Sequence, residues 1–328
     1  MRKQRQIHNA LIDRGKCERA LRHLLLKTTA KQLVRMLYSP YEAVVDFMLL
    51  CRDEKTGEKI SMLFNPHRFD IKTNTDHSIT AGFDKSEWFS GLARITLHLA
   101  YNSGISKSKN IVRGLLYQAL GMNINGHKYV NEFPPYIARD LYKRYHAKRI
   151  LDPCAGWGGR MIGASAVGSH YHAYEPSTKT YEGLLELAAF LQSFETGFSF
   201  ELFNEPFEEA NVPDGFDLAF TSPPYYDTEH YSKERTNSLY KFTSFKKWVA
   251  GFYLPLVKTC LQSAEHTVLN IGTRQYDLLS PLEELYPIKR LRCGLSGKGG
   301  LGKTKKGQEA LYEIDAEDTE PKATGFGL

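Results

Sequence analysis

The sequence lacks long apolar runs and any regular cysteine pattern, and these absences exclude several classes of protein. No stretch approaches the ~18 uncharged apolar residues that a membrane-spanning helix needs, and no apolar signal-peptide core follows the charged first residues. The cysteines are odd in number and lack the spacing of zinc sites or disulfide frameworks; they are Cys17, Cys51, Cys154, Cys260 and Cys293. We therefore expect a cytoplasmic protein in a reducing compartment, without a membrane partner.

Acidic residues are scarce in the first 35 positions, which hold two Asp or Glu against ten Lys or Arg. The other positions hold 33 basic and 35 acidic residues, so the net charge of +6 comes from this N-terminal arm. A basic arm suits a polyanion such as nucleic acid. A solvated helix face explains the same charges equally well.

The first part of the chain is predicted to be mostly helical. Leucines recur there at helical spacing between basic residues; they are Leu21, Leu24, Leu25, Leu33 and Leu37. Further helices are expected over 41–51, 88–101 and 111–120, with a short strand over 60–64. We interpret residues 1–125 as a helical, basic region for nucleic-acid or target recognition, and residues 126–328 as the second domain.

Alternating helices and strands begin near residue 136 and predict an α/β fold. Helices are expected over 136–146, 160–167, 180–191 and 245–261. The strands are expected over 149–151, 171–174, 198–203, 216–220, 267–271, 288–293 and 310–314. This order predicts a Rossmann-like, doubly wound sheet with a mostly helical N-terminal extension, and ligands beyond the carboxyl ends of the strands.

A glycine-rich turn, Asp152–Gly159, follows the first of these strands. Its glycines let the backbone adopt positive φ and let a ligand approach closely. The spacing is not Gly-x-Gly-x-x-Gly, and the carboxylate of Asp152 suits a ligand with cationic groups better than a phosphate. S-adenosylmethionine, with its sulfonium and ammonium groups, is such a ligand. The residues expected to bind it are Asp152, Cys154, Ala155, Gly156 and Gly158.

Two acids follow the next two strands. Glu175 lies 23 residues after Asp152 and ends a strand, where an acid can bind both ribose hydroxyls of a nucleoside. Glu205, together with Phe207, is expected near the adenine. For each acid, an ordinary solvated loop carboxylate is the alternative.

A second turn, Ser222–Tyr225, reads Ser-Pro-Pro-Tyr and follows the strand over 216–220. An aromatic amine is a poor nucleophile, because its lone pair is delocalised into the ring. The Ser222 hydroxyl and the Pro223 carbonyl can accept its hydrogens and so direct the lone pair at a methyl donor. Pro223 and Pro224 fix the backbone, and Tyr225 can stack on an extruded base. We expect these four residues to be catalytic; a proline-stiffened turn without chemistry is the alternative.

Together the two turns resemble the motifs of amino-methyltransferases that act on DNA, at cytosine N4 or adenine N6. The cofactor motif of that family is Asp-Pro-Phe-x-Gly-x-Gly, and its catalytic motif is (Asp/Asn/Ser)-Pro-Pro-(Tyr/Phe). The resemblance covers about residues 130–315. Phe133 is similar to the family segment that closes over the methionine end of the cofactor. Two positions depart from the pattern, since Cys154 replaces Phe and Gly159-Arg160 replaces a small residue and Thr.

The resemblance implies an S-adenosylmethionine-dependent DNA methyltransferase, bacterial or phage-encoded, with double-stranded DNA as its partner. The Ser-Pro-Pro-Tyr form is met most often in N4-cytosine members and favours that base. The alternatives are N6-adenine methylation, methylation of RNA or of a protein, and a non-catalytic nucleic-acid-binding protein. The sequence does not indicate an oligomeric state.

Two polar segments are candidates for contact with nucleic acid. Aromatic and basic residues interleave over 226–243 and suit a flipped base with its flanking phosphates; the expected contacts are Tyr226, Lys233 and Arg235. Gly297–Thr304 fits the triphosphate-binding pattern Gly-x-x-x-x-Gly-Lys-Thr, but no helix pattern follows it. We interpret it as a basic loop whose Lys298 and Lys303 contact phosphates.

Two other patterns are not expected to carry chemistry. Pro153-Cys154 matches the nucleophile dipeptide of C5-cytosine methyltransferases, but that dipeptide follows the fourth strand there, so Cys154 is interpreted as structural. His170 and His172 share one strand face, which can suit a metal. The sequence shows no third ligand at a useful spacing, so no metal site is predicted.

Overall fold

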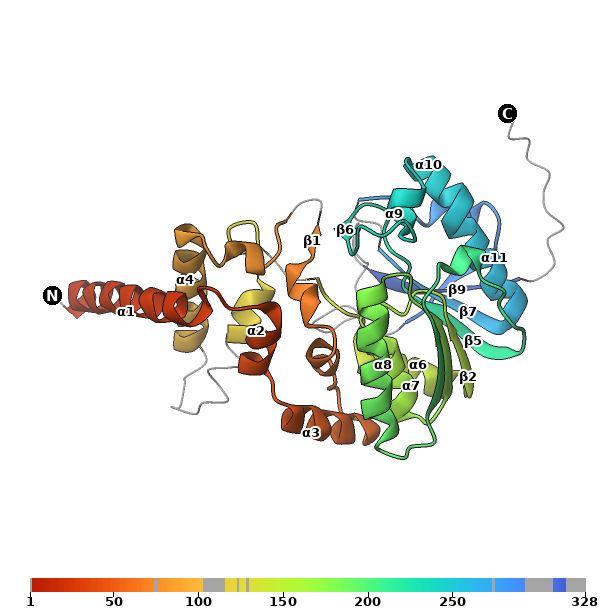
Figure 1. The fold of residues 1–328 in the computed structure, drawn as a ribbon, viewed down its shortest axis with the longest axis horizontal. Coiled ribbons are helices and arrows are strands. Elements are labelled where there is room, and N and C mark those ends of the chain that lie inside the picture. Colours follow the sequence, from red (N-terminus) through yellow and green to blue (C-terminus); the bar gives the residue numbers. More distant parts are fainter. Residues whose placement is uncertain are drawn as a thin grey trace. The chain divides into compact units, whose positions relative to one another are not determined.

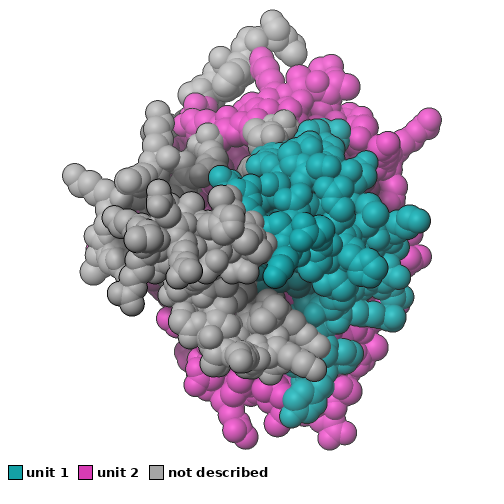
Figure 2. Space-filling model, turned by 90° about the vertical axis from the view of Figure 1, so that its left-hand side faces the viewer, with its two compact units in different colours: residues 1–44, 65–131, 229–231 teal, residues 45–64, 132–228, 232–328 magenta. Residues whose placement is uncertain are grey.

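The structure is a computed structural model that describes residues 2–73, 76–102, 116–122, 124–127, 130–272, 275–292 and 309–316. The chain divides into two compact units, coloured separately in Figure 2. Unit 1 contains residues 1–44, 65–131 and 229–231, and unit 2 contains residues 45–64, 132–228 and 232–328. In the part of the chain that the structure describes, no helix is both long and apolar enough to span a bilayer.

Unit 1 is mostly helical. Its elements are α1 (Arg2–Leu25), α2 (Ala30–Leu37), the start of α3 (Pro40–Cys51), η2 (Pro66–Asp70), β1 (Lys72–Thr73), η3 (Thr80–Gly82), α4 (Ser86–Asn102) and β6 (Glu229–His230). The α2 helix begins with a capping box, in which Thr29 and Gln32 satisfy each other's backbone N–H groups. Arg14 of α1 donates to the Ser90 hydroxyl of α4 at 2.6 Å. The apolar core includes Leu25, Leu33, Leu37, Phe69, Trp88, Phe89 and Leu92.

Unit 2 is built on a seven-stranded sheet. Its strands are β2 (Arg149–Asp152), β3 (His170–Tyr174), β4 (Ser199–Phe203), β5 (Phe216–Thr221), β7 (Ala264–Ile271), β8 (Ile288–Arg290) and β9 (Ala310–Ile314). They lie in the order β4-β3-β2-β5-β7-β9-β8. The first five of this order are parallel, and β9 pairs antiparallel with both β7 and β8. The switch point therefore lies beside β2, the strand that enters the glycine-rich turn.

Helices cover both faces of this sheet (Figure 1). One group is α6 (Pro135–Arg144), α7 (Gly159–Ala166) and α8 (Thr178–Gln192). The other is α9 (Ser238–Lys241), α10 (Phe245–Trp248), the π-helical η5 (Val249–Tyr253) and α11 (Leu254–Ser263). Short elements complete the unit: η1 (Ile60–Leu63), η4 (Phe207–Glu209) and α12 (Ser280–Glu283). Between α11 and the sheet lies a core that includes Phe216, Leu256, Val257, Leu269 and Ile271.

The end of α3 and the turn after it belong to unit 2 through the buried guanidinium of Arg139. Arg139 of α6 is 2% exposed and donates to the carbonyls of Leu50 at 2.7 Å, Glu54 at 2.9 Å and Asp53 at 3.2 Å. Asp140 accepts from the same guanidinium at 2.6 Å. Each buried donor thus has an acceptor, which fastens residues 45–64 to the start of the α/β unit.

The predicted α/β, Rossmann-like architecture with a helical N-terminal part is confirmed. All seven expected strands form, and their bounds shift by a few residues. The strand predicted over 60–64 was wrong, because Ile60–Leu63 is a 3-10 helix. The helix predicted over 245–261 is interrupted by η5, which lies just before Pro255, a residue with no N–H to donate. The helix expected over 111–120 lies partly outside the described residues.

Glycines at the start of α7 make room for neighbouring backbone and side chains. A Cβ on Gly159 would lie 2.1 Å from the carbonyl oxygen of Phe133, and one on Gly158 would lie 2.5 Å from Leu187 Cδ2. Gly158 also has φ +94°, which side chains rarely adopt. A β-carbon at either position would therefore force the glycine-rich turn away from α8 or from the segment before α6.

We predict that Gly159→Ala lowers the free energy of unfolding by about 2 kcal/mol or more, because the clash is with backbone that cannot rotate away. Gly15→Ala is the matched control. Gly15 lies within α1, where a Cβ would meet only the end of Arg19 at 3.6 Å. This substitution should leave stability unchanged or raise it by about 0.5–1 kcal/mol. Urea unfolding of both variants measures the difference, and equal stability of the two would contradict the packing argument.

Candidate functional site

The two motif turns leave the sheet side by side. The strand β2 pairs directly with β5, with Leu151 opposite Ala219. Both strands run in the same direction, so the glycine-rich turn and the Ser-Pro-Pro-Tyr turn begin at the same edge of the sheet. A hydrogen bond of 2.8 Å from the Thr221 hydroxyl to Asp152 Oδ1 joins the last residues of the two strands. The two turns, which are distant in sequence, therefore begin next to each other in the fold.

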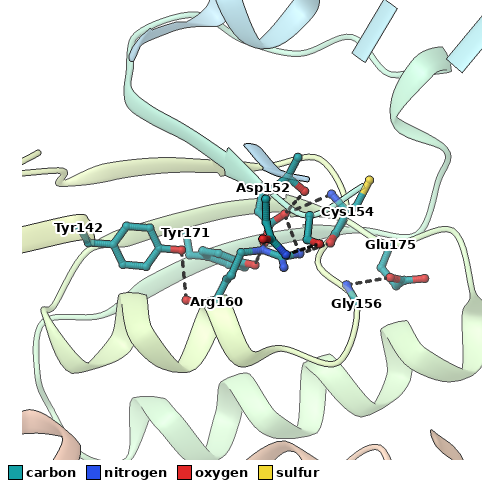
Figure 3. Close-up of polar contacts among 10 residues, drawn as sticks. Tyr142, Asp152, Cys154, Gly156, Arg160, Tyr171 and Glu175 are labelled. Carbon is teal, nitrogen blue, oxygen red and sulfur yellow. Dashed lines mark hydrogen bonds and ion pairs between the residues drawn. The ribbon is translucent and has the colours of Figure 1, made fainter. Parts of the chain in front are cut away.

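The carboxylate of Asp152 is fully buried and is held by donors from four segments (Figure 3). Arg160 of α7 donates from Nε at 2.7 Å and from Nη2 at 3.2 Å. The Tyr171 hydroxyl of β3, the Thr221 hydroxyl of β5 and the Cys154 backbone N–H also donate to it. Arg160 reaches the Cys154 carbonyl as well. A buried charge with this many donors is fully compensated.

Asp152 is expected to bind the cofactor, and its contacts give it a structural role in the glycine-rich turn as well. Both of its oxygens already accept hydrogen bonds from protein groups. The pair of Asp152 with Arg160 fixes the path of the chain between β2 and α7. Arg160 is one of the positions at which the sequence departs from the family pattern. It is 5% exposed, and its guanidinium is part of the folded turn.

Cys154 belongs to the same cluster. Burial, followed by the nearby carboxylate of Asp152, raises the pKa of its thiol well above the ordinary value. A protonated thiol is a weak nucleophile. These surroundings favour the structural interpretation of Cys154 over a nucleophile of the C5-cytosine type.

Glu175 follows β3 and faces the glycine-rich turn. Its two carboxylate oxygens accept from the backbone N–H of Gly156 at 3.0 Å and of Ser177 at 2.9 Å. Burial raises its pKa to about 7, and the two backbone hydrogen bonds oppose this rise. Because the folded protein disfavours the charged form, Glu175 makes the protein less stable as the pH rises through about 7.

The other residues predicted to contact the cofactor follow the ends of β2 and β4 or precede α6. Phe207 is 3% exposed and packs edge-on against Tyr174, with ring centroids 5.1 Å apart. Glu205 is exposed beside it. Phe133 is buried, and its ring lies edge-on against Phe220 of β5 at 5.1 Å. Ala155 is buried and donates its N–H to the Tyr174 carbonyl. Of these four residues, Glu205 is the exposed one and the other three are buried.

The Ser-Pro-Pro-Tyr turn is organised by Asn270, a residue that the sequence analysis missed. Asn270 lies near the end of β7 and is 2% exposed. Its Nδ2 lies 3.1 Å from Ser222 Oγ, 3.2 Å from the Tyr225 hydroxyl and 3.3 Å from Glu309 Oε2. An ionised carboxylate only accepts, so Glu309 fixes the nitrogen toward this side. The two hydrogens of this amide thus have three acceptors within reach, and two of these acceptors belong to the turn.

The other polar atom of this amide is its carbonyl oxygen, Oδ1. Asn270 Oδ1 is buried, and no described residue donates a hydrogen bond to it. Buried acceptors of this kind call for an explanation, a ligand or water being the usual one. Gly272, just beyond the strand, makes room for the Tyr225 ring, because a Cβ there would lie 2.9 Å from Tyr225 Cε2. Gly272 is a signal in the sequence that points to the end of β7.

The residues expected to contact nucleic acid have different surroundings. Tyr226 has φ +55° and packs against Phe245, Trp248 and Tyr276, with ring centroids 5.2–5.9 Å apart. Lys233 and Arg235 are both exposed. Lys298 and Lys303 lie outside the described residues. Tyr226 is thus part of an aromatic cluster, and the exposed basic side chains are those that follow it.

No protein-family model matches the chain, and no curated protein matches it. Among solved structures, it is similar to magnesium protoporphyrin IX methyltransferase from Synechocystis PCC 6803 with bound SAM, at 10% identity and a TM-score of 0.36, over 56% of this chain and 79% of that one. A human methyltransferase 10 domain containing protein overlaps at 12% identity and a TM-score of 0.37, over 58% and 85%. An rRNA methylase from Streptococcus thermophilus overlaps at 11% identity and a TM-score of 0.35, over 56% and 96%. Overlaps this partial carry no conclusion about activity or substrate.

We predict that Arg160→Met lowers the free energy of unfolding by about 3–5 kcal/mol, because it leaves Asp152 as an unpaired buried charge. The double variant with Asp152→Asn should recover part of that loss, since no charge is then left unpaired. Lys289→Met is the control, because Lys289 is 67% exposed in its ion pair with Glu313. It should change stability by less than about 0.5 kcal/mol. The free energies of unfolding lost in Arg160→Met and in Asp152→Asn should not simply add in the double variant. Strict additivity in denaturant unfolding would show that the two residues do not act as a pair.

Proposed function

We propose that this protein is an S-adenosylmethionine-dependent methyltransferase that acts on an exocyclic amine of a DNA base. The observation that carries the proposal is the pairing of β2 with β5, which brings the glycine-rich turn and the Ser-Pro-Pro-Tyr turn to one sheet edge. A methyl donor held by the first turn and an amine held by the second would then lie within reach of each other.

The residues at the glycine-rich turn fit the proposed cofactor. Gly156 has φ +57°, and a Cβ built there meets only the Cys154 carbonyl at 3.8 Å, so the backbone is open on that side. A ligand can therefore approach the main chain of Gly156 closely, whereas Gly158 lies against Leu187 of α8. Glu175, beside Gly156, offers a carboxylate for a ribose diol. Asp152 contributes by holding the turn, through Arg160, in the shape that presents these groups.

The remaining contacts follow from the neighbouring strand ends. Phe207 supplies a buried aromatic wall for the adenine, and Glu205 an exposed acceptor for its amine. Phe133, with Cys154 and Ala155, borders the methionine end. Bound in this position, S-adenosylmethionine supplies an electrophilic methyl group.

At the second turn, the chain's own acceptors orient the target amine. Ser222 Oγ and the Pro223 carbonyl accept its two hydrogens, which holds the nitrogen lone pair toward the methyl donor. Asn270 donates to Ser222 and so leaves a serine lone pair for the amine. Pro224 stiffens the turn, and Tyr225, held through its hydroxyl, offers a ring face to the base.

DNA is the proposed partner, and cytosine N4 the favoured target. The supports are the likeness of the motifs to amino-methyltransferases of DNA, the serine that leads the catalytic motif, and the basic N-terminal arm. The exposed Lys233 and Arg235 follow the Ser-Pro-Pro-Tyr turn and suit flanking phosphates. Recognition by residues 1–125 stays a prediction.

The decisive measurement is transfer of label from methyl-tritiated S-adenosylmethionine to unmethylated DNA, with RNA and protein substrates in parallel. We expect label in DNA, and nucleoside analysis should find N4-methylcytosine. N6-methyladenine would identify the other base, and label confined to RNA or protein would replace DNA as the substrate. Salt-sensitive DNA binding without any cofactor binding would instead favour a non-catalytic binding protein.

Ser222→Ala should lower kcat by about 100-fold, the scale at which one oriented polar contact acts in a transition state. Asn270→Leu should lower kcat in the same direction by a smaller factor, because Ser222 remains but loses its orienting donor. Both variants should bind the cofactor within about twofold of the wild type, measured by calorimetry. Ser193→Ala, at the end of α8, is the control and should change neither quantity. Unchanged kcat in Ser222→Ala would remove the serine from the mechanism.

Glu175 predicts a pH-dependent affinity for the ribose. Ribose hydroxyls donate to the charged carboxylate, so binding lowers a pKa that starts at about 7 and releases a proton near neutral pH. Adenosine is the cleaner probe, since it carries the ribose without the titrating amine of the amino acid. Its affinity should rise from pH 6 to pH 8, and Glu175→Gln should abolish the rise. Calorimetry in two buffers of different ionisation enthalpy measures the proton. Equal pH profiles for the two proteins would rule out Glu175 as the ribose ligand.

A further inference from the structure

Away from the motif turns, β3 and β4 bring three possible metal ligands together. His170 and His172 lie two residues apart on β3, so they point to the same face of the sheet. Glu201 of β4 lies directly opposite His172 in the register of the two strands. The ligand atoms of the three side chains all lie within 4.8 Å of one another. The sequence analysis found no third ligand for the histidine pair, and the parallel pairing of the strands supplies one.

The donor atoms converge on one carboxylate oxygen. Glu201 Oε2 lies 2.7 Å from His172 Nδ1 and 3.7 Å from His170 Nε2. The three side chains differ in exposure: His172 is 4% exposed, His170 28% and Glu201 56%. A buried ligand with two accessible ones makes a site that is anchored in the sheet and open to solvent on one side. The exposed His170 and Glu201 can shift by the small amount that metal–ligand bonds of about 2.0–2.2 Å require.

Each histidine also has a partner for its second ring nitrogen. His170 Nδ1 lies 2.9 Å from the Ser199 hydroxyl, and His172 Nε2 lies 3.0 Å from the Tyr174 hydroxyl. His172 Nδ1 lies at hydrogen-bond distance from Glu201 Oε2, which accepts its hydrogen, so a metal would take the place of that hydrogen. With His172 Nε2–H donating to Tyr174 and His170 Nδ1–H donating to Ser199, His170 Nε2 and His172 Nδ1 would then be the lone-pair donors. Metal-bound histidines in proteins nearly always have such a partner, which fixes the tautomer and the ring orientation. This second layer is independent of the distances among the ligands.

The surroundings of the cluster are compatible with a cation. Arg149 of β2 lies opposite His170 in the sheet, and its guanidinium is engaged with the Gly215 carbonyl at 2.8 Å and with the Phe216 ring. Aromatic rings of Phe203 and Phe216 lie 4.8 and 5.2 Å from the His172 ring. The apolar walls limit water around His172, and the carboxylate of Glu201 offsets part of the charge of a divalent ion.

We propose that His170, His172 and Glu201 form a binding site for a divalent transition metal, with Zn²⁺ the best match. Two imidazoles and a carboxylate are a common zinc ligand set, and the open side leaves a fourth position for water. The ion would join the edge strand β4 to β3 between the start and the middle of the two strands, whereas Glu175 follows the end of β3. The proposal therefore does not depend on the proposed function.

Metal titrations of the full, tag-free chain test this proposal. Calorimetry with Zn²⁺ and the visible absorption of Co²⁺ should show one site per chain with a four-coordinate spectrum. His170→Ala and Glu201→Gln change accessible side chains and should each weaken binding at least tenfold. His266→Ala is the matched control, because His266 faces Glu313 at 3.5 Å on another strand pair without a second histidine, and it should bind metal like the wild type.

The thermal midpoint provides a second readout. Excess Zn²⁺ should raise the midpoint of the wild type and of His266→Ala, because a ligand of the folded state stabilises it by mass action. The midpoints of His170→Ala and Glu201→Gln should not move. Absence of binding to the wild type, or unchanged affinity in both ligand variants, would overturn the proposal.

Discussion

The site depends on the neutralisation of one buried carboxylate. Asp152 ends β2 and is bound by groups from α7, β3, β5 and the turn itself, so four segments meet at two oxygen atoms. A charge removed from water requires such compensation. If one of these donors were lost, the carboxylate would be left under-compensated in the low-dielectric interior. The arrangement of the strand ends, and with it the position of both turns, follows from this requirement.

Much of the unit 2 architecture could be predicted from the sequence, because short apolar runs alternate there with helical periodicity. Parallel strands buried on both faces are largely apolar, and glycines mark the turn after β2, where backbone passes close to backbone. The apolar runs over 149–151 and 216–220 therefore predicted where in the sequence the two turns begin. The sequence did not specify that these two strands are neighbours, because the doubly wound pattern indicates the strand order only in outline.

The contacts that refine the site were hidden for a physical reason: each depends on register between strands far apart in the sequence. Asn270 reaches Ser222 across the β5–β7 pair, and Glu201 meets His172 across β3–β4. Arg160 was noted as a departure from a motif, and only the folded turn shows that its partner is Asp152. The wrong strand at 60–64 shows the converse, since a short apolar run alone does not distinguish a strand from a 3-10 turn.

The close approach of Gly159 to the Phe133 carbonyl has a mechanical consequence. No side chain lies between these two stretches of main chain, so there is nothing compressible to take up relative movement. The entry to α6 and the first turn of α7 must travel as one rigid piece.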